Sequence, residues 1–175
     1  MKNVNNLVVS IIGVGNIGFR YYQAILDLEC VQQINLIEKE IESLKKKIKI
    51  NSTNKEITFN KKLSADLLDS DLIIISTTSS QRFDICKKLR DLGYYGDLIL
   101  EKFLFPDANT LSKSEIFFDS YPSKIYVNQW MRKTNLRKML YSHKPAEIEI
   151  VSDNLGMLCN SVHYIDLICE RYKSY

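Results

Sequence analysis

A glycine-rich turn near the N-terminus holds the residues whose types and spacing point most directly to chemistry. An apolar run over residues 8–12 leads into Gly13, Gly15 and Gly18, which match the pattern G-x-G-x-x-G. In a strand-turn-helix unit the first glycine permits the tight turn, the second lets the backbone approach a pyrophosphate, and the third lets the helix pack on the strand. The phosphates then meet the positive end of the helix. The residues expected to hold a dinucleotide in this turn are Gly13, Gly15, Asn16, Ile17 and Gly18.

A carboxylate follows at the spacing that such a site requires. A second apolar run over 34–37 ends on Glu38, which lies about 20 residues beyond Gly18. A carboxylate there accepts hydrogen bonds from both ribose hydroxyls and repels a 2′-phosphate, so the sequence predicts NAD as the cofactor in preference to NADP. Lys39 and the lysines after it oppose this preference.

Further polar side chains follow later apolar runs, where a parallel sheet places its ligand crevice. The run over 72–75 is continuous, as expected for a strand buried on both faces, and it ends in a hydroxyl-rich turn. The run over 98–100 ends on Glu101 and Lys102, and Asn128 closes a later strand. The residues at these strand ends that are expected to contact the cofactor are Thr77, Thr78, Ser79, Glu101 and Asn128.

The elements that position these groups alternate in a βαβ pattern. Apolar residues recur at helical spacing after the glycine turn, and short apolar runs separate the helices. The expected strands cover 8–12, 34–37, 56–59, 72–75, 98–100 and 124–128, and the expected helices cover 16–29, 41–48, 81–92 and 109–121. Because parallel strands joined by helices form a doubly wound sheet, we expect an α/β chain with a Rossmann-like parallel sheet within residues 1–145.

The chain beyond residue 145 changes pattern. Residues 147–151 alternate polar and apolar side chains, which predicts an antiparallel strand with one face in water. A last helix is expected over 157–172, where Cys159, His163 and Asp166 lie on neighbouring turns. A zinc ion needs at least three protein ligands. Since Cys159 and His163 supply only two, no metal site is expected.

Composition and charge exclude several classes of protein. The net charge is +3 and no basic stripe is interleaved with aromatic residues, so a nucleic-acid partner is not expected. The longest uncharged run, over 3–19, is too polar and too short to cross a bilayer, so no membrane partner is expected either. The four cysteines are scattered without C-x-x-C spacing, which favours reduced thiols in a cytoplasmic protein.

The order of these motifs resembles the Gfo/Idh/MocA family, which includes glucose-fructose oxidoreductase and inositol dehydrogenase. The features that carry the resemblance are, in order, the glycine turn, Glu38, residues 76–78, Glu101, Lys102, Asn128 and residues 160–166. The resemblance covers nearly all of the chain. It implies an NAD(P)-dependent dehydrogenase that acts on a CH–OH group of a sugar, nucleotide sugar or cyclic polyol. It also implies that Lys102 lies near the nicotinamide and the substrate hydroxyl, and that His163 contacts the substrate.

The chain departs from the family pattern at four points. Phe103 stands where the family's E-K-P motif has proline. Arg82 stands where the family's T-P-x-x-x-H turn has histidine, and Thr78 stands where that turn has proline. Cys159 replaces the aspartate that lies four residues before the family's histidine. Family members also continue into a second, mostly antiparallel domain, so residues 146–175 are expected to begin a truncated α+β substrate and dimerisation domain. A homo-oligomer would form through that sheet if it were complete.

Two functions stay open at this point. The first is an oxidoreductase in which Lys102 and His163 act on the substrate hydroxyl. The second is a dinucleotide-binding module without catalysis, or a fragment of a disrupted gene, which the missing aspartate at 159 and the short chain favour. The sequence therefore does not decide whether this chain is itself an active enzyme.

Overall fold

The computed structural model describes residues 6–48, 53–142, 147–151 and 157–172, without the side chains of 157–159. The chain divides into two compact units, Met1–Val127 and Asn128–Tyr175, which we call unit 1 and unit 2 and describe separately. This division falls earlier in the chain than the domain boundary expected at residue 145. That boundary stays a prediction, because a compact unit need not coincide with a domain.

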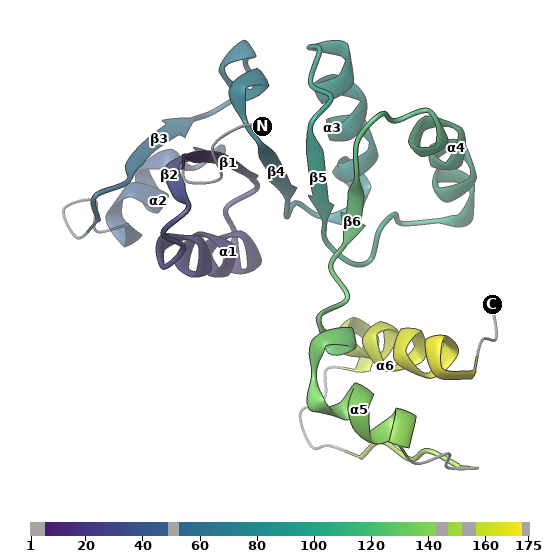
Figure 1. The fold of residues 1–175 in the computed structure, drawn as a ribbon. Coiled ribbons are helices and arrows are strands. Elements are labelled where there is room, and N and C mark those ends of the chain that lie inside the picture. Colours follow the sequence, from purple (N-terminus) through teal and green to yellow (C-terminus); the bar gives the residue numbers. More distant parts are fainter. Residues whose placement is uncertain (1–5, 49–52, 143–146, 152–156, 173–175) are drawn as a thin grey trace. The chain divides into compact units, whose positions relative to one another are not determined.

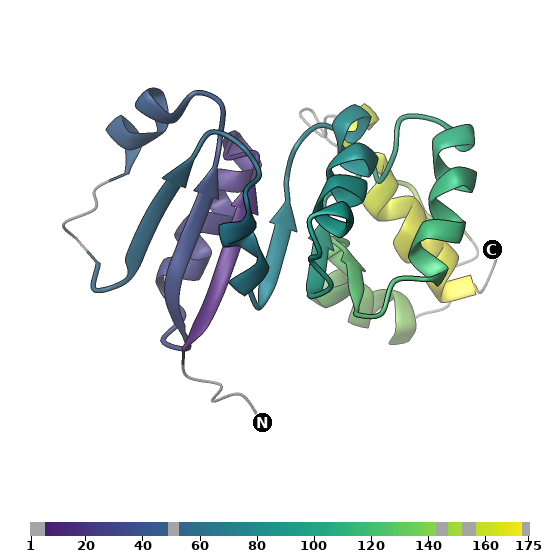
Figure 2. The same cartoon turned by 90° about the horizontal axis from the view of Figure 1, so that it is seen from above.

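Unit 1 is built on a six-stranded parallel sheet, and Figure 2 shows several of its strands side by side. Its strands are β1 Leu7–Ile12, β2 Val31–Ile37, β3 Glu56–Asn60, β4 Leu72–Ile75, β5 Asp97–Leu100 and β6 Ile125–Val127. The order is β3-β2-β1-β4-β5-β6, and every neighbouring pair is parallel. This is the doubly wound Rossmann order, as the sequence predicts. Because the order reverses between β1 and β4, a ligand crevice belongs outside the carboxyl ends of these two strands.

Different helices cover the two faces of the sheet (Figure 1). The helices of unit 1 are α1 Asn16–Leu26, α2 Ile41–Lys47, α3 Ser79–Asp91 and α4 Ala108–Asp119, with a short 3-10 helix, η2, at Ala65–Asp69. Tyr22 of α1 and Leu44 of α2 pack in one buried cluster with residues of β1 and β2. Cys86 and Leu89 of α3 pack in a second cluster with residues of β4 and β5. Both faces of the central strands are therefore buried, which explains their continuous apolar sequence.

The expected elements of unit 1 are present, with ends that move by a few residues. Helix α1 ends at Leu26 rather than at 29, and Asp27 follows it as the C-cap. Strand β2 begins at Val31 rather than at 34. Gln33 interrupts the apolar run, yet it pairs with Val8 of β1. The apolar pattern therefore does not reveal the first residues of this strand.

Unit 2 contains helices and no strand among its described residues. Its elements are η3 Trp130–Lys133, α5 Asn135–Ser142 and α6 Met157–Tyr172. The sequence predicts α6 but neither of the other two. None of the helices in the described ranges of either unit is long and apolar enough to cross a membrane.

The strand expected over 147–151 is wrong, because these residues form neither strand nor helix. A strand needs a neighbour to satisfy its backbone, and no strand in the described part of unit 2 offers one. The apolar side chains at the end of this segment are also exposed, Val151 by 80% and Ile150 by 36%, although Ile148 is half-buried. The expected start of an α+β domain is therefore not evident in this segment.

Candidate functional site

The glycine turn combines two positions that only glycine can fill with one that leaves open space. Gly13 has φ +85°, and a Cβ there would lie 2.6 Å from Thr77 Cγ2. A Cβ on Gly18 would collide with the carbonyl oxygen of Gly13. A Cβ on Gly15 would meet no atom within 4 Å. Gly13 and Gly18 therefore shape the turn, whereas Gly15 keeps the space in front of the N-terminus of α1 free.

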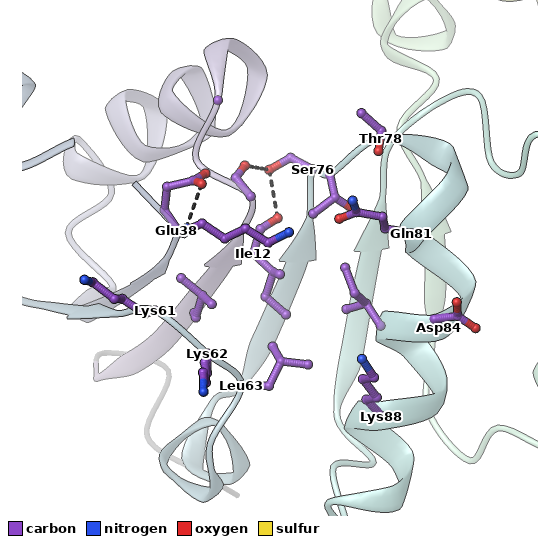
Figure 3. A pocket seen from close by; sticks show the side chains of 16 residues that line it. Ile12, Glu38, Lys61, Lys62, Leu63, Ser76, Thr78, Gln81, Asp84 and Lys88 are labelled. Carbon is purple, nitrogen blue, oxygen red and sulfur yellow. Dashed lines mark hydrogen bonds between the residues drawn. The ribbon is translucent and has the colours of Figure 1, made fainter. Parts of the chain in front are cut away.

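A serine joins the turn to the end of β4, across the point where the strand order reverses. The Ser76 hydroxyl lies 2.7 Å from the Gly13 carbonyl oxygen and 3.3 Å from that of Ile12, and it donates to these acceptors (Figure 3). The backbone N–H of Ser76 also donates to the Ile12 carbonyl. These bonds hold the carboxyl ends of β1 and β4 together, which is where the fold places a ligand.

Glu38 reaches from the end of β2 to the mouth of the turn. Its Oε2 accepts a hydrogen bond of 2.7 Å from the Val14 backbone N–H. Its Oε1 accepts one of 2.8 Å from the N–H of Lys39 (Figure 3). An ionised carboxylate has about four acceptor positions. Two therefore remain for hydroxyl groups of a ligand, in the place where the sequence predicts a ribose.

A cleft of about 740 Å³ opens beside these groups. This volume lies in the range of small-molecule sites. Figure 3 shows side chains entering the cleft from the end of β2, the segment after β3, the β4–α3 turn and one face of α3. Thr77 lines it, and the Thr77 hydroxyl is buried without a hydrogen-bond partner among the described residues. This hydroxyl has almost no exposed surface, so the Thr77 side chain must rotate before it can donate to a ligand in the cleft.

The charges around the cleft favour an anion. Four lysines line it, against the two carboxylates Glu38 and Asp84. The lysines are Lys39, Lys61, Lys62 and Lys88. A hydrogen bond from Lys87 lowers the pKa of Asp84, so Asp84 keeps its charge at neutral pH. The positive surplus suits a ligand that carries phosphate groups.

The residues predicted from sequence fall into three groups in the structure. Those that line the cleft are Gly13, Gly15, Glu38, Thr77 and Thr78. A second group belongs to unit 1 but does not line the cleft. Its members are Asn16, Ile17 and Gly18 in the first turn of α1, Ser79 at the start of α3, and Glu101 and Lys102 after β5. Those in unit 2 are Asn128 and His163.

Sequence reasoning missed the α3 face of the cleft and the segment after β3. The α3 residues of the lining are Gln81, Asp84, Ile85 and Lys88, and those after β3 are Lys61, Lys62 and Leu63. The spacing along α3 is that of one helical face, which could have been found by projecting the helix from the hydroxyl-rich turn. Nothing in the local sequence marks the segment after β3, since its position depends on the sheet order.

The β5 end carries a buried carboxylate directly before Lys102. Glu101 is 5% exposed, and the Tyr21 hydroxyl donates a hydrogen bond of 2.5 Å to its Oε1. Lys102 is half-buried, with its Nζ 5.9 Å from the centre of the Phe103 ring. The peptide bond between Lys102 and Phe103 is cis. Tyr21 belongs to α1, so the helix that follows the glycine turn also contacts the strand end that carries the lysine.

In unit 2, His163 is buried and held by a side chain before η3. Its Nδ1 lies 2.7 Å from Gln129 Oε1, and the His163 ring packs edge-on against Trp130 with ring centres 5.6 Å apart. Since an amide oxygen only accepts, Nδ1 is the donor in this contact. Asp166 accepts two hydrogen bonds from Arg132, of 2.6 and 2.7 Å.

Within the described ranges, no group of three histidine, cysteine, aspartate or glutamate side chains could hold a metal ion.

The chain is similar in fold to many solved structures, and three of them illustrate the similarity. A myo-inositol 2-dehydrogenase from Lactobacillus plantarum has a TM-score of 0.71 at 18% identity, covering 95% of this chain and 56% of that chain. A scyllo-inositol dehydrogenase from Lactobacillus casei with bound NAD(H) and scyllo-inositol has a TM-score of 0.66 at 16% identity, covering 94% and 55%. The WlbA dehydrogenase from Chromobactrium violaceum, in complex with NADH and UDP-GlcNAcA, has a TM-score of 0.64 at 16% identity, covering 82% and 41%.

These structures confirm, at the level of the fold, the resemblance to Gfo/Idh/MocA oxidoreductases that the motif order predicts. The chain spans about half the length of the structures it matches. No protein-family model matches the sequence. No curated protein matches it either.

Proposed function

We propose, from this Gfo/Idh/MocA-type fold, that the chain binds NAD(H) in the cleft and provides the dinucleotide-binding part of an oxidoreductase acting on a sugar, nucleotide sugar or cyclic polyol. The observation that carries the proposal is the open space at Gly15, with Glu38 beside it at the reversal point of the sheet. A pyrophosphate needs backbone access without a side chain, and the ribose next to it needs an acceptor.

The residues of the cleft fit the parts of a dinucleotide. The glycine turn and the start of α1 would hold the pyrophosphate, where backbone N–H groups and the helix dipole favour negative charge. Glu38 would accept from the ribose hydroxyls, and Thr77, which lines the cleft, would contact the ligand. Leu63 and Ile85 line the cleft further along and would contact an apolar base.

The proposal favours NAD over NADP. A 2′-phosphate would have to lie against the Glu38 carboxylate, and like charges at that distance repel. Lys39 and Lys61 line the same cleft and reduce the repulsion without removing the carboxylate. We therefore expect a preference for NAD rather than an exclusion of NADP.

For chemistry, the cofactor supplies a nicotinamide that accepts a hydride from the carbon of an alcohol group. Lys102 is the residue we assign to take the proton from the substrate hydroxyl, and the family resemblance assigns His163 a role in substrate binding. The solved relatives support the substrate class, since one of them binds scyllo-inositol and another binds UDP-GlcNAcA.

A second candidate is nucleotide binding without turnover. The observation that favours it is Cys159, which stands where the family has an aspartate four residues before the histidine. In this second function the cleft of unit 1 binds NAD(H) as above, and Lys102 and His163 do no chemistry.

Calorimetric titration with NADH and NADPH tests the shared part of both functions. We expect NADH to bind more tightly than NADPH. The matched pair of variants is Glu38→Gln, in the cleft, and Glu42→Gln, on the exposed face of α2. Tighter binding of NADPH by the wild type would contradict the assignment of Glu38. Spectrophotometric detection of NADH formation from NAD with inositols and nucleotide sugars then separates the enzyme from the module.

A further inference from the structure

Arg82 is a charged side chain buried in unit 1 without lining the cleft. It lies in the first half of α3 and is 1% exposed. An arginine is rarely so fully buried, because a guanidinium removed from water needs other groups to replace its hydration. The partners of Arg82 therefore show what the residue does.

The guanidinium bridges two loops at the carboxyl edge of the sheet. Nη2 donates a hydrogen bond of 2.5 Å to the carbonyl of Thr77, in the turn between β4 and α3. Nη1 donates to the carbonyl of Phe103 and, at 2.9 Å, to that of Leu104, in the loop after β5. The second loop begins with Lys102. One side chain thus ties the loop that lines the cleft to the loop that carries the lysine.

The chemistry of the contact requires arginine. Its planar fork directs donors from two nitrogens, which matches carbonyl groups on two separate loops, whereas a lysine presents one compact charge. Burial lowers the pKa of Arg82, and the nearby Glu101 charge opposes that shift. Arginine stays protonated in proteins, so the contact stays charged. Glu101 is 5% exposed and accepts a hydrogen bond from Tyr21 of α1, so α1 is also connected to this group of buried polar side chains.

Thr77 contacts both Arg82 and the cleft. It therefore connects the hydrogen bonds of Arg82 to Thr77, Phe103 and Leu104, which we call the clamp, to a ligand in the cleft. Its carbonyl accepts from Arg82, while the residue itself belongs to the lining of the cleft. A ligand that packs against Thr77 in the cleft restrains this residue, and its carbonyl then holds the guanidinium that also donates to the carbonyls of Phe103 and Leu104.

We propose that Arg82 is a positioning residue which couples occupancy of the cleft to the order of the loop that carries Lys102. Binding of a dinucleotide at Thr77 restrains Phe103 and Leu104 through the guanidinium, and so restrains the backbone that presents the lysine. The inference rests on the proposed function for its ligand, but the contacts of Arg82 do not depend on that function.

Backbone hydrogen exchange, followed by mass spectrometry with and without NADH, measures the coupling. In the wild type we expect NADH to slow exchange at residues 103–105 by about 10-fold, a coupling of ordinary size. In Arg82→Gln the same peptide exchanges faster without ligand, and NADH no longer slows it. Arg82→Lys keeps the charge but not the fork, and we expect it to restore part of the protection.

Arg90→Gln is the matched control. Arg90 lies on the same helix and donates to the Ser120 hydroxyl, away from both loops. We expect its exchange at 103–105 and the effect of NADH to equal those of the wild type. A purely structural role of Arg82 would alter exchange across α3 and β4 as well, and would leave the NADH effect at 103–105 intact in any variant that folds.

The outcomes separate the two proposals. If NADH binds the wild type and exchange at 103–105 does not change, the coupling is wrong, and this measurement needs no variant to fold. If NADH does not bind at all, the proposed function fails. Hydrogen exchange of the ligand-free proteins then tests whether Arg82 restrains the loop. Equal exchange at 103–105 in the wild type and in Arg82→Gln or Arg82→Lys overturns the clamp, whereas faster exchange in the variant supports it.

Discussion

Unit 1 and unit 2 hold their polar side chains in different ways. In unit 1, Glu38, Ser76 and Glu101 directly follow buried parallel strands, so the register of the sheet sets their positions. In unit 2, His163 and Asp166 share one helix, and their side chains contact Gln129, Trp130 and Arg132. The first arrangement is fixed by backbone and the second by pairs of side chains.

The difference has a physical consequence for function. A sheet core that packs at every strand keeps its ligand edge in place when one hydrogen bond is lost, because many apolar contacts fix the backbone. Helix α6 buries Leu167 and otherwise relies on a few polar pairs, so removing one partner takes away a larger share of its contacts. We therefore expect changes in unit 1 to separate ligand binding from stability, and changes in unit 2 to act mainly on local stability.

Substitutions at two of the three glycines of the turn, Gly13 and Gly15, give the largest expected effects. Gly15→Val should fold as the wild type does and lower the affinity for NADH at least about 100-fold, since the valine side chain fills the space left for a pyrophosphate. Gly13→Val should instead lower the free energy of unfolding by about 3 kcal/mol or more, because its φ of +85° and its contact with Thr77 exclude a branched side chain. Urea unfolding and calorimetry measure the two effects.

This pair of variants can break the comparison. If Gly15→Val bound NADH normally, the glycine turn would not be the ligand site. If Gly15→Val unfolded like Gly13→Val, the turn would be a structural feature only, and the open space at residue 15 would have no functional meaning.

Glu38→Gln gives the next effect. We expect the affinity for NADH to fall about 10- to 100-fold, the loss associated with hydrogen bonds to a charged acceptor. The preference for NADH over NADPH should shrink at the same time, because the amide does not repel a 2′-phosphate. The amide oxygen can still accept from Val14 N–H, so the turn keeps its shape. Glu42→Gln, whose side chain is exposed, should change neither affinity.

The same contrast between the units explains how much the sequence predicts. The fold of unit 1 follows from continuous apolar strands and helical periodicity, and both signals are local. The strand end at Glu38 and the hydroxyl-rich turn at Thr77 are predicted because strand ends of a parallel sheet share one edge. Gly13 and Gly15 are predicted because their roles depend on backbone geometry alone.

Non-local contacts account for what the sequence does not predict. The lining of the cleft by Leu63 and Ile85 arises from segments that become neighbours only in the folded sheet. The clamp of Arg82 on Phe103 joins residues whose spacing carries no pattern. In unit 2, the alternation over 147–151 predicts a strand, but alternation cannot supply the neighbouring strand that would satisfy it.

Alkaline pH should weaken unit 1 through a buried thiol. Burial raises the pKa of Cys86 from 9.0 to about 12, so the folded state holds a proton that the unfolded chain releases. The resulting stability is complete below pH 9 and is lost as the pH rises toward 12. Burial also raises the pKa of Tyr94 and Tyr121, which adds to the loss at higher pH.

At pH 10 the Cys86 contribution should amount to a loss of about 1 kcal/mol relative to pH 8. Urea unfolding at pH 8, 9 and 10 measures it, with Cys86→Ala as the comparison. The cavity in Cys86→Ala lowers stability at every pH, so the slope with pH is the relevant quantity. An equal slope in both proteins would show that the thiol does not cause the alkaline loss.

The smallest effect is expected in unit 2, where two ion pairs form a matched test of fixation by side chains. Arg132 is 39% exposed and pairs with Asp166, which is 16% exposed, while Arg137 is 40% exposed and pairs with Glu170, which is 19% exposed. Exposure is therefore nearly equal, but the Arg132 hydrogen bonds measure 2.6 and 2.7 Å and those of Arg137 measure 3.1 and 3.3 Å.

Asp166→Asn should lower local stability by about 1 kcal/mol, because water can still reach the guanidinium. Glu170→Gln should cost less, since its pair is longer. Hydrogen exchange in α6 compares the two variants, and NADH affinity should stay unchanged in both. A larger effect from Glu170→Gln would show that pair geometry does not set the stability of this helix, and a change in NADH affinity would show that unit 2 contributes to the nucleotide site.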